Sequence, residues 1–413
     1  MGKRKSSITA TTSRDEAFEP DLNRAFDHVM QLMAIPGKTG QEAKVADFVV
    51  RHLRKAGASA KSIETDSAHK RSPIPGGQLG NLVMKLPGTI RGPRRLLSAH
   101  LDTVPICVGS KPVRRGNTVR SADPNTGLGA DNRAGCAVLL TAALAILEHK
   151  LPHPPLTFCW FVQEETGLHG SRNVSKGLLG KPKLAFNWDG GSPVKLTIGA
   201  TGGYRMLVEL EGIASHAGGA PEQGVSAIAI ASLAIADLQR NGWHGDIRKD
   251  GKHGTSNVGY IFGGEATNVV TDRVTLKVEA RSHDPKFRKR IVRKIEQAFR
   301  RAATEVKNVS GVAGKATIEG HLDYESFLLK RDEPSVLVGE KAVRAIGEEP
   351  LHAVANGGVD ANCLTAHGIS AVSLGCGQKY QHMVTEELNV AEFHNACRIG
   401  MRLATATEES GQV

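Results

Sequence analysis

Residues 80–190 alternate short apolar segments with a long helical pattern, and this alternation restricts the chain to an α/β fold. The segments predicted as strands are GNLVMKLPG (80–88), RRLLSAHLD (94–102), LTFCWFV (156–162) and KLAFNW (183–188). The apolar run AGCAVLLTAALAIL (134–147) follows a predicted loop at 109–132. It is too short to span a bilayer and is typical of a buried helix. We therefore predict an α/β sheet flanked by helices.

The rhythm of the sequence changes after residue 200, which indicates a second structural unit inserted into the first. Strand-like and helix-like segments then follow in the order β-α-β-β-α-β, typical of a small ferredoxin-like layer. These segments are 202–212, 224–240, 255–264, 273–282, 286–301 and 314–325. Outside them lie helical patterns at 21–35, 41–57 and 332–347 and a strand pattern at 371–375. We predict a disordered tail over residues 1–19, an α/β domain over 20–200 and 325–413, and an inserted domain over 201–324.

Charge and cysteine content favour a globular protein of a reducing compartment. The 413 residues are 40% hydrophobic and carry a net charge of +11, part of which lies in the basic helix pattern at 286–301. That helix has one apolar stripe and no aromatic-interleaved basic motif, so we predict neither a nucleic-acid nor a membrane partner. Six cysteines without a CxxC pair, and an N-terminus without an apolar core, favour reduced thiols and a cytoplasmic location.

Two adjacent glutamates, Glu164 and Glu165, directly follow the predicted strand at 156–162. Neighbouring side chains on an extended chain point to opposite faces. Because acidic residues are mostly exposed, a solvated strand end is the simpler interpretation of the pair. The alternative is a division of labour in which one carboxylate binds a metal ion and the other moves a proton. The choice depends on which other residues reach the same point.

Other polar residues interrupt the apolar pattern at similar places. His100 and Asp102 lie two residues apart on a strand, so Asp102 can brace His100 from behind, as carboxylates commonly do for a metal-binding imidazole. Taken singly, Asp131 before the buried helix is more typical of a helix cap, and Asp189 in NWDGG is more typical of a tight turn. His382 in KYQHMVTEEL is, on its own, more typical of a structural or surface histidine.

Taken together, these residues predict a metal site. Two imidazoles and three carboxylates lie at predicted strand ends or in the following loops: His100, Asp131, Glu165, Asp189 and His382. In an α/β sheet those ends converge on one edge, where ligands bind. This set suits two zinc-like ions that share a bridging carboxylate and activate a water molecule. The reaction also needs a base near that water, and Glu164 is the candidate.

The motifs resemble those of the co-catalytic zinc metallopeptidase family that includes peptidase T, aminoacylases and the glutamate carboxypeptidases. They occur in order over residues 21–405: SAHLDTVP, GADNRAG, QEETG, NWDGG, SHAGGAPEQGVSAI and QHMV. The resemblance is closest to the peptidase T-like branch, because Asp131 follows His100 by only 31 positions and the insert comes after Asp189. It implies a mixed-sheet zinc-exopeptidase domain carrying an inserted lid and dimerisation domain.

By this resemblance the chain is expected to bind two Zn²⁺ ions, with Co²⁺ or Mn²⁺ as substitutes. His100, Asp131 and Asp189 are expected to hold one ion. Asp131, Glu165 and His382 are expected to hold the second, so that Asp131 bridges the pair.

The resemblance also implies roles for residues outside the metal site. His216, which alone is more typical of a surface histidine, is expected to stabilise the oxyanion of the reaction, in some members from the partner subunit of a homodimer formed by residues 201–324. Asn268 and Arg281 match substrate-binding positions, although a turn amide and a surface cation are comparably simple interpretations. Gly357 and Gly358 match a loop whose backbone N–H groups receive a substrate carboxylate.

The resulting hypothesis is an exopeptidase that removes N-terminal residues from short peptides, with Glu164 as general base. Asp at position 189, where several acylases and carboxypeptidases carry Glu, resembles the di- and tripeptidase branches. One alternative keeps the mechanism but changes the substrate, giving an N-acyl amino acid deacylase or a carboxypeptidase. The non-enzymatic alternative is a metal-bound scaffold that binds a peptide without turnover, against which the intact Glu164 argues.

Overall fold

A nine-stranded mixed sheet forms the larger part of the structure, a computed structural model in which residues 18–405 are described. Its central strands are parallel, in the order β6 (Leu156–Phe161), β3 (Arg95–His100), β7 (Leu184–Trp188) and β16 (Ala371–Leu374). The flanking strands are β1 (Ile63–Thr65), β2 (Leu82–Leu86), β8 (Lys195–Ala200), β14 (Phe327–Leu328) and β15 (Leu351–Ala355). The predicted α/β class is confirmed, whereas the predicted tail lies almost wholly outside the described residues.

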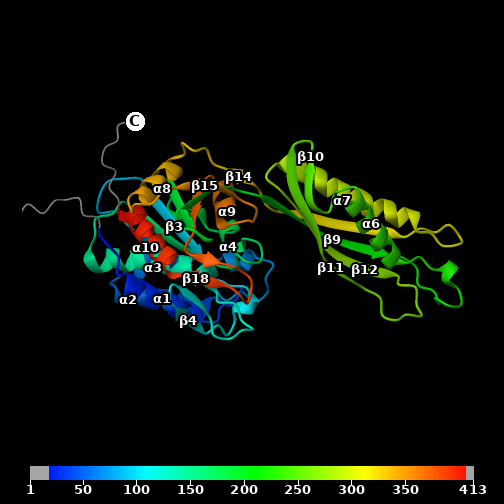
Figure 1. The fold of residues 1–413 in the computed structure, drawn as a ribbon, viewed down its shortest axis with the longest axis horizontal. Coiled ribbons are helices and arrows are strands. Elements are labelled where there is room, and N and C mark those ends of the chain that lie inside the picture. The colour runs from blue at the N-terminus through cyan, green and yellow to red at the C-terminus, as the bar shows by residue number, and fades with distance from the viewer. Residues whose placement is uncertain (1–17, 406–413) are drawn as a thin grey trace, which may run out of the picture.

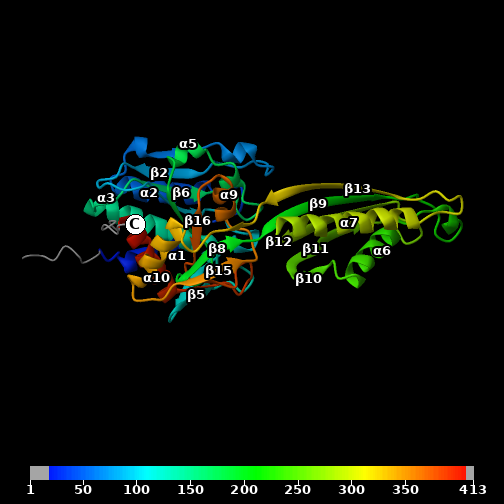
Figure 2. The same cartoon turned by 90° about the horizontal axis from the view of Figure 1, so that it is seen from above.

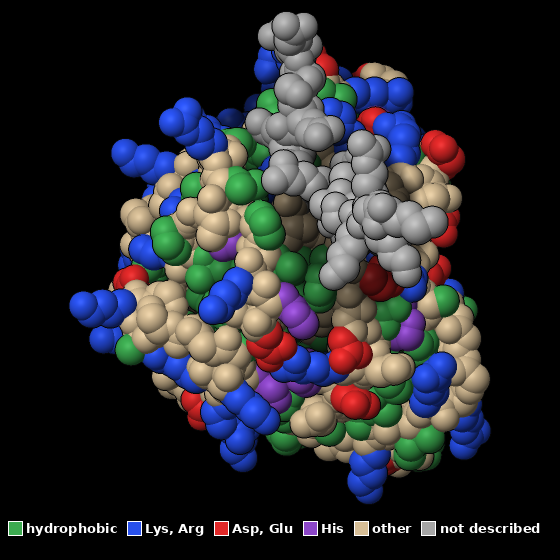
Figure 3. Space-filling view, turned by 90° about the vertical axis from the view of Figure 1, so that its left-hand side faces the viewer, with side chains coloured by type: hydrophobic (Ala, Val, Ile, Leu, Met, Phe, Trp, Pro, Cys, Tyr) green, Lys and Arg blue, Asp and Glu red, His purple; other side chains and the backbone are tan. Residues whose placement is uncertain are grey.

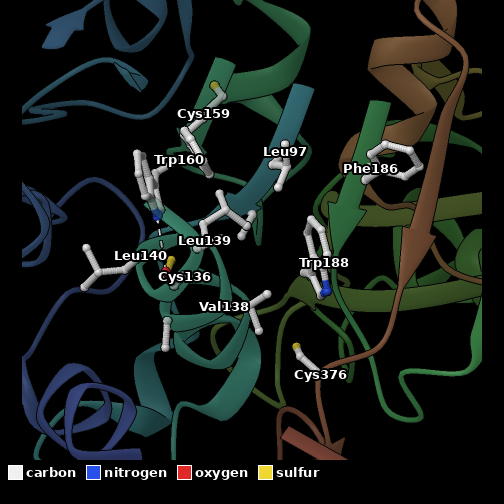
Figure 4. Packing of buried hydrophobic residues seen from close by; sticks show 14 of the residues in the cluster. Leu97, Cys136, Val138, Leu139, Leu140, Cys159, Trp160, Phe186, Trp188 and Cys376 are labelled. Carbon is white, nitrogen blue, oxygen red and sulfur yellow. Dashed lines mark hydrogen bonds between the residues drawn. The ribbon is translucent and has the colours of Figure 1, made fainter. Parts of the chain in front are cut away.

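The buried helix predicted from the apolar run is α3 (Ala130–His149), and it organises the main core. It packs on β3 and β7, and its side chains meet Trp160 and Trp188 of the sheet (Figure 4). By length and composition α3 could cross a bilayer, but 89% of its most apolar window is buried inside the fold. Its apolar surface is therefore removed from water by packing within the fold.

The remaining helices of this part surround the sheet. Helices α1 (Leu22–Ala34) and α2 (Ala43–Lys55) match the predicted segments, and α8 (Pro334–Arg344) matches the third. The predictions omit α10 (Val390–Thr405), which packs on α1, α3 and α8. The short helices are α4 (His169–Arg172), α5 (Lys176–Leu179), α9 (Asp360–Ala366), and the 3₁₀ turns at Ala60–Ser62, Ala68–Arg71, Pro105–Cys107 and Pro221–Gln223.

A second, five-stranded antiparallel sheet extends from the first (Figures 1 and 2). Its order is β10 (Gly245–Lys249), β11 (Lys252–Gly263), β12 (Arg273–Ser282), β9 (Gly202–Glu211) and β13 (Lys315–Tyr324). Helices α6 (Ala227–Arg240) and α7 (Pro285–Glu305) cover one face and share a hydrophobic core with it. The β-α-β-β-α-β order agrees with the sequence pattern, and β10 is an additional edge strand.

The loop predicted at 109–132 is partly wrong, because it contains the hairpin β4 (Pro112–Arg115) and β5 (Thr118–Ser121). Both strands are short and mostly polar, so they lack the alternating apolar pattern that marks a strand in sequence. The hairpin joins a four-stranded sheet with β17 (Gln378–Lys379) and β18 (Glu387–Asn389). This pairing brings the segment after His382 against the segment before α3.

Charged side chains are dispersed over the end of the larger part that faces the viewer in Figure 3. Lysine and arginine side chains are distributed around this face with aspartate and glutamate side chains between them. In the second part, Arg290 and Arg301 on α7 form ion pairs with Asp250 and Asp237. The net charge of +11 therefore does not form one continuous cationic field on this face.

Acid is expected to destabilise the fold through His28 on α1. This side chain is 5% exposed, and its ring lies 4.7 Å from that of His52 and 6.1 Å from that of Phe48 on α2. Burial, reinforced by the charges of His52 and Arg24, lowers the pKa of His28 to about 4. Because the unfolded-state pKa is about 6.5, the unfolded chain takes up the proton first, and about 3 kcal/mol of stability is lost as the pH falls from about 6.5 to about 4.

Urea unfolding of the native chain and of His28→Leu at pH 7 and pH 4.5 measures this effect. The variant is expected to lose less stability on acidification than the native chain. His321→Gln, a change at an exposed histidine of β13, serves as the control and should keep the native pH dependence. Equal pH dependence in His28→Leu and the native chain would contradict the prediction.

Candidate active site

The carboxyl ends of the four parallel strands bring five of the predicted residues to one edge of the sheet. His100 is the last residue of β3, Glu164 and Glu165 follow β6, and Asp189 follows β7. The chain after β16 continues through a glycine-containing turn and β17 to His382. Convergence at this edge follows from the parallel order of the strands.

Asp131 lies between the two histidines, in the turn that opens α3. Its Oδ1 is 3.2 Å from Nε2 of His100, and its Oδ2 is 3.5 Å from Nε2 of His382. Asp131 and Asn132 have non-helical backbone angles, so the regular helix begins after them. One carboxylate therefore presents a different oxygen to each imidazole, which is the arrangement that a bridging ligand needs.

Asp102 connects the ends of β3 and β6. It is fully buried, and its Oδ1 lies 3.4 Å from Nδ1 of His100. Its carboxylate also accepts hydrogen bonds from the backbone N–H of Glu164 at 3.0 Å, from that of Glu165 at 3.2 Å, and from the hydroxyl of Thr39 at 2.7 Å. Asp102 thus orients the histidine and also fixes the backbone of both glutamates.

The clustered carboxylates shift one another's protonation. Burial, together with the charge of Asp131, raises the pKa of Glu165 to about 7. Burial also raises the pKa of Glu164 well above its usual range, and the charge of Asp189 adds to that rise. Hydrogen bonds to Asp131 and Glu165 raise the pKa of His382 to about 10. The common cause is a concentration of negative charge in a site with little access to water.

The residues fit a pair of divalent metal ions. Ligand atoms lie within 4.8 Å of one another in two groups, His100 with Asp131 and Glu165, and His100 with Glu164 and Asp189. Among the described residues, Oε1 of Glu165 is a buried carboxylate oxygen without a hydrogen-bond donor. Divalent cations supply both the missing charge and a partner for such an oxygen.

Two of the predicted residues lie far from this cluster on the same chain. His216 is in the loop after β9, where its Nδ1 accepts hydrogen bonds from the N–H groups of Gly218 and Gly219. Asn268 lies beside it, and its backbone oxygen accepts from the N–H of Ala217. The ten residues of β9 extend about 30 Å from the first sheet to this loop. The structure therefore does not bring His216 and Asn268 to the metal ligands of their own chain.

The other predicted substrate-binding residues lie where the two sheets join. Arg281 is paired in register with Gly203 and makes a two-pronged ion pair, 3.0 Å on each arm, with Glu279. A side chain at Gly357 would meet open space, whereas a Cβ at Gly358 would lie only 2.5 Å from the Tyr324 ring. Gly358 therefore allows a close approach of the loop to the strand that leaves the second sheet.

Sequence reasoning missed the side chains that hold the turns of this site together. Nε2 of Gln378 donates to the backbone oxygen of Ala130 and to Oδ1 of Asn132, while its Oε1 accepts from the N–H of Gly190. Gln378 thus ties the turn of Asp131 to the turn of Asp189. Glu386, also missed, belongs to a second pair of adjacent glutamates, and that pair was the available signal.

The arrangement can bind metal ions and hold a proton acceptor beside them. Two imidazoles and the shared carboxylate of Asp131 face one another across the site, and Oε2 of Glu164 is 3.9 Å from Nε2 of His100. Glu164 is 8% exposed, whereas the side chain of His382 is 53% exposed and lies at the mouth of the site. Such a site suits hydrolysis of an amide or ester by an activated water.

Comparison with known proteins agrees with this chemistry. The sequence model of peptidase family M20/M25/M40 matches residues 96–406. The uncharacterized protein YqjE of Bacillus subtilis is 30% identical over 370 residues, covering 89% of this chain and 94% of that protein. A tripeptidase of Staphylococcus aureus superposes with a TM-score of 0.83 at 28% identity, covering 94% and 99% of the two chains. The aminopeptidase PepT of Bacillus cereus gives a TM-score of 0.78 at 30% identity, covering 94% and 98%.

Zinc is expected to stabilise the protein more at pH 8 than at pH 5. The raised pKa of Glu165, about 7, means that its carboxyl is mostly protonated at pH 5 and must lose the proton to bind metal. At 100 times the dissociation constant, zinc binding adds about 2.7 kcal/mol per site at pH 8. The measurement is the change in Tm when Zn²⁺ is added to chelator-treated protein across this pH range. Glu165→Gln should greatly reduce the change, and an equal change at both pH values in the native chain would contradict the assignment.

Proposed function

We propose that this chain, which belongs to peptidase family M20/M25/M40 and is a metallopeptidase, is a dinuclear zinc aminopeptidase acting on short peptides. The family membership confirms the resemblance recognised in the motifs. The observation that carries the proposal is the position of Asp131, whose two oxygens face His100 and His382 separately. A carboxylate in that position suits a bridge between two ions.

The proposed ligands divide the site between two ions. His100, Asp131 and Asp189 would hold one ion, and Asp131, Glu165 and His382 would hold the other. When bound, two such ions polarise the amide carbonyl and lower the pKa of a water molecule. Asp102 keeps the imidazole of His100 in its orientation through the contact with Nδ1.

Glu164 is the proposed general base. It takes the proton of the attacking water and transfers it to the departing amine of the peptide. Its backbone is fixed by the hydrogen bond to Asp102, and its carboxyl oxygen lies beside the predicted ligands of one ion. The raised pKa of Glu164, caused mainly by burial, suits a group that must hold the proton before passing it on.

An aminopeptidase action on short peptides is the proposed specificity. It is supported by the match to a tripeptidase and to an aminopeptidase over nearly the whole length of both chains. The proposed compartment is the cytoplasm, because all six cysteines are buried and unpaired. We propose no nucleic-acid or membrane partner, in keeping with the charges of both signs on the face shown in Figure 3.

Glu164→Gln is expected to bind zinc like the native chain and to lose roughly 10²–10⁴-fold in kcat, because the amide cannot accept the proton. The assay is mass spectrometry of products from dipeptides, tripeptides, longer peptides and N-acetyl amino acids, with zinc content measured on the same samples. Loss of single N-terminal residues supports the aminopeptidase proposal. Release of C-terminal residues would instead identify a carboxypeptidase, and release of acetate a deacylase. A native kcat in Glu164→Gln would refute the role of Glu164 as the base.

We further propose that residues 201–324 form a lid and the interface of a homodimer. Strand β10 pairs with β11 only as far as Ser256, so the rest of β11 is an open edge of the sheet. Apolar side chains on this edge are 44% (Tyr260), 53% (Ile261) and 67% (Phe262) exposed. An open strand edge with exposed apolar side chains favours pairing with another chain. A second copy of the chain would bury this edge and bring its own His216 loop to the partner's site.

Phe262→Asp is expected to convert the dimer into a monomer and to lower kcat at least tenfold, because a charge on the apolar edge opposes pairing. Sedimentation velocity measures the change. Leu322→Asp is the matched control, since Leu322 is 46% exposed on β13, the opposite edge strand. A monomeric native chain with full activity would refute the proposed interface.

Mixing two inactive variants tests whether His216 acts across the dimer. In a heterodimer of Glu164→Gln and His216→Ala chains, one site combines an intact Glu164 with a partner's intact His216. Random re-association should restore roughly a quarter of native activity, since half of the dimers are mixed and each has one complete site. Absence of recovery, with mixed dimers demonstrated by mass, would place His216 outside the reaction.

A further inference from the structure

Glu386 is a buried carboxylate that accepts three hydrogen bonds from backbone N–H groups of the turn that carries Asp131, and one, at 3.4 Å, from the thiol of Cys107. It is 1% exposed and lies four positions after His382. Its Oε2 accepts from the backbone N–H of Leu128 at 2.9 Å and of Gly129 at 2.7 Å. Its Oε1 accepts from the backbone N–H of Asp131 at 2.9 Å. One side chain therefore satisfies three of the N–H groups in this turn.

The turn needs such an acceptor because its backbone cannot use helical hydrogen bonds. Gly129 has φ 79° and ψ 24°, in the left-handed region, and Asp131 has φ −83° and ψ 106°. N–H groups that converge in a turn of this kind form a concave site for an anion. In this chain the anion is the protein's own carboxylate, held in place by the pairing of β18 with β5.

The same short segment reaches Asp131 from two directions. At its start, Nε2 of His382 is 3.5 Å from Oδ2 of Asp131, and at its end Glu386 holds the Asp131 backbone. The segment thereby sets the distance between one predicted metal ligand and the carboxylate predicted to bridge both ions. Asp102 does the equivalent for Glu164 and Glu165 on the other side of the site.

We propose that Glu386 is a positioning residue that sets the geometry of the bridging Asp131 and so the affinity of the site for its metal ions. The inference rests on the proposed dinuclear function. Glu386 touches neither substrate nor metal in this proposal, and it acts only through the backbone of Asp131.

Two substitutions separate the charge of Glu386 from its shape. In Glu386→Gln, the amide has one oxygen acceptor, and its NH₂ group donates, so at least one buried backbone N–H loses its partner. Glu386→Asp keeps the charge but shortens the reach by one methylene. Glu387→Gln is the matched control, because the neighbouring Glu387 pairs at the surface with Arg120 and faces away from the Asp131 turn.

The experiment measures Zn²⁺ affinity by competition with a chromophoric chelator, using the metal alone as the probe. Loss of a residue that orients a metal ligand typically weakens metal binding by about 10–100-fold. We expect a weakening of that size in Glu386→Gln, a smaller one in Glu386→Asp, and native affinity in Glu387→Gln. We also expect kcat to fall in Glu386→Gln with little change in KM, because the substrate contacts are untouched.

A purely structural role for Glu386 makes a different prediction. It lowers the Tm of chelator-treated protein but leaves zinc affinity and kcat at native values, and that result would overturn the inference. If Glu386→Gln does not fold, Glu386→Asp decides the question, since native zinc affinity in that variant also overturns it. Measurements on the native chain distinguish failure of this inference from failure of the proposed function. If the native chain binds zinc and hydrolyses peptides, and Glu386→Gln has the same zinc affinity and kcat, this inference alone is refuted. If the native chain does not bind zinc, the proposed function and this inference are both refuted.

Discussion

The hydrogen bonds from the backbone N–H groups of Glu164 and Glu165 to Asp102 join the ends of β6 and β3. Parallel strands bring residues to a common edge, but the chain beyond each strand is free to turn in many directions. A buried carboxylate that accepts two neighbouring N–H groups removes that freedom for both glutamates at once. The roles proposed for the two side chains, Glu165 as a metal ligand and Glu164 as the base, depend on this fixed turn.

Such an arrangement concentrates negative charge in a place where it is costly. The carboxylates raise one another's pKa values, as at Glu165, and a site of this kind lowers the stability of the metal-free fold. The surrounding core offsets this cost, because α3 is almost wholly buried against β3 and β7. The charge at one edge is thus tolerated because of the close apolar packing directly behind it.

Sequence reasoning recovered what is periodic or local. The apolar runs predicted β3, β6, β7 and α3, because burial on both faces leaves a continuous apolar pattern. The polar hairpin β4–β5 has no such pattern, whereas α10 was not predicted although its apolar residues have helical spacing.

The contacts that complete the site are of another kind, because they join distant positions. The partner of Asp102 is 62 residues away, and Glu386 binds a backbone group 255 residues away. No local pattern encodes such pairs.

The distance of His216 from its own site has the same origin in tertiary structure. Nδ2 of Asn362 donates to the backbone oxygens of Thr201 and Glu325, one in each of the two segments that connect the sheets. Because Asn362 on α9 holds both segments, a loop about 30 Å away along β9 does not reach the predicted metal ligands of its own chain in this structure. The role proposed for His216 in the reaction is therefore assigned to the partner of a homodimer.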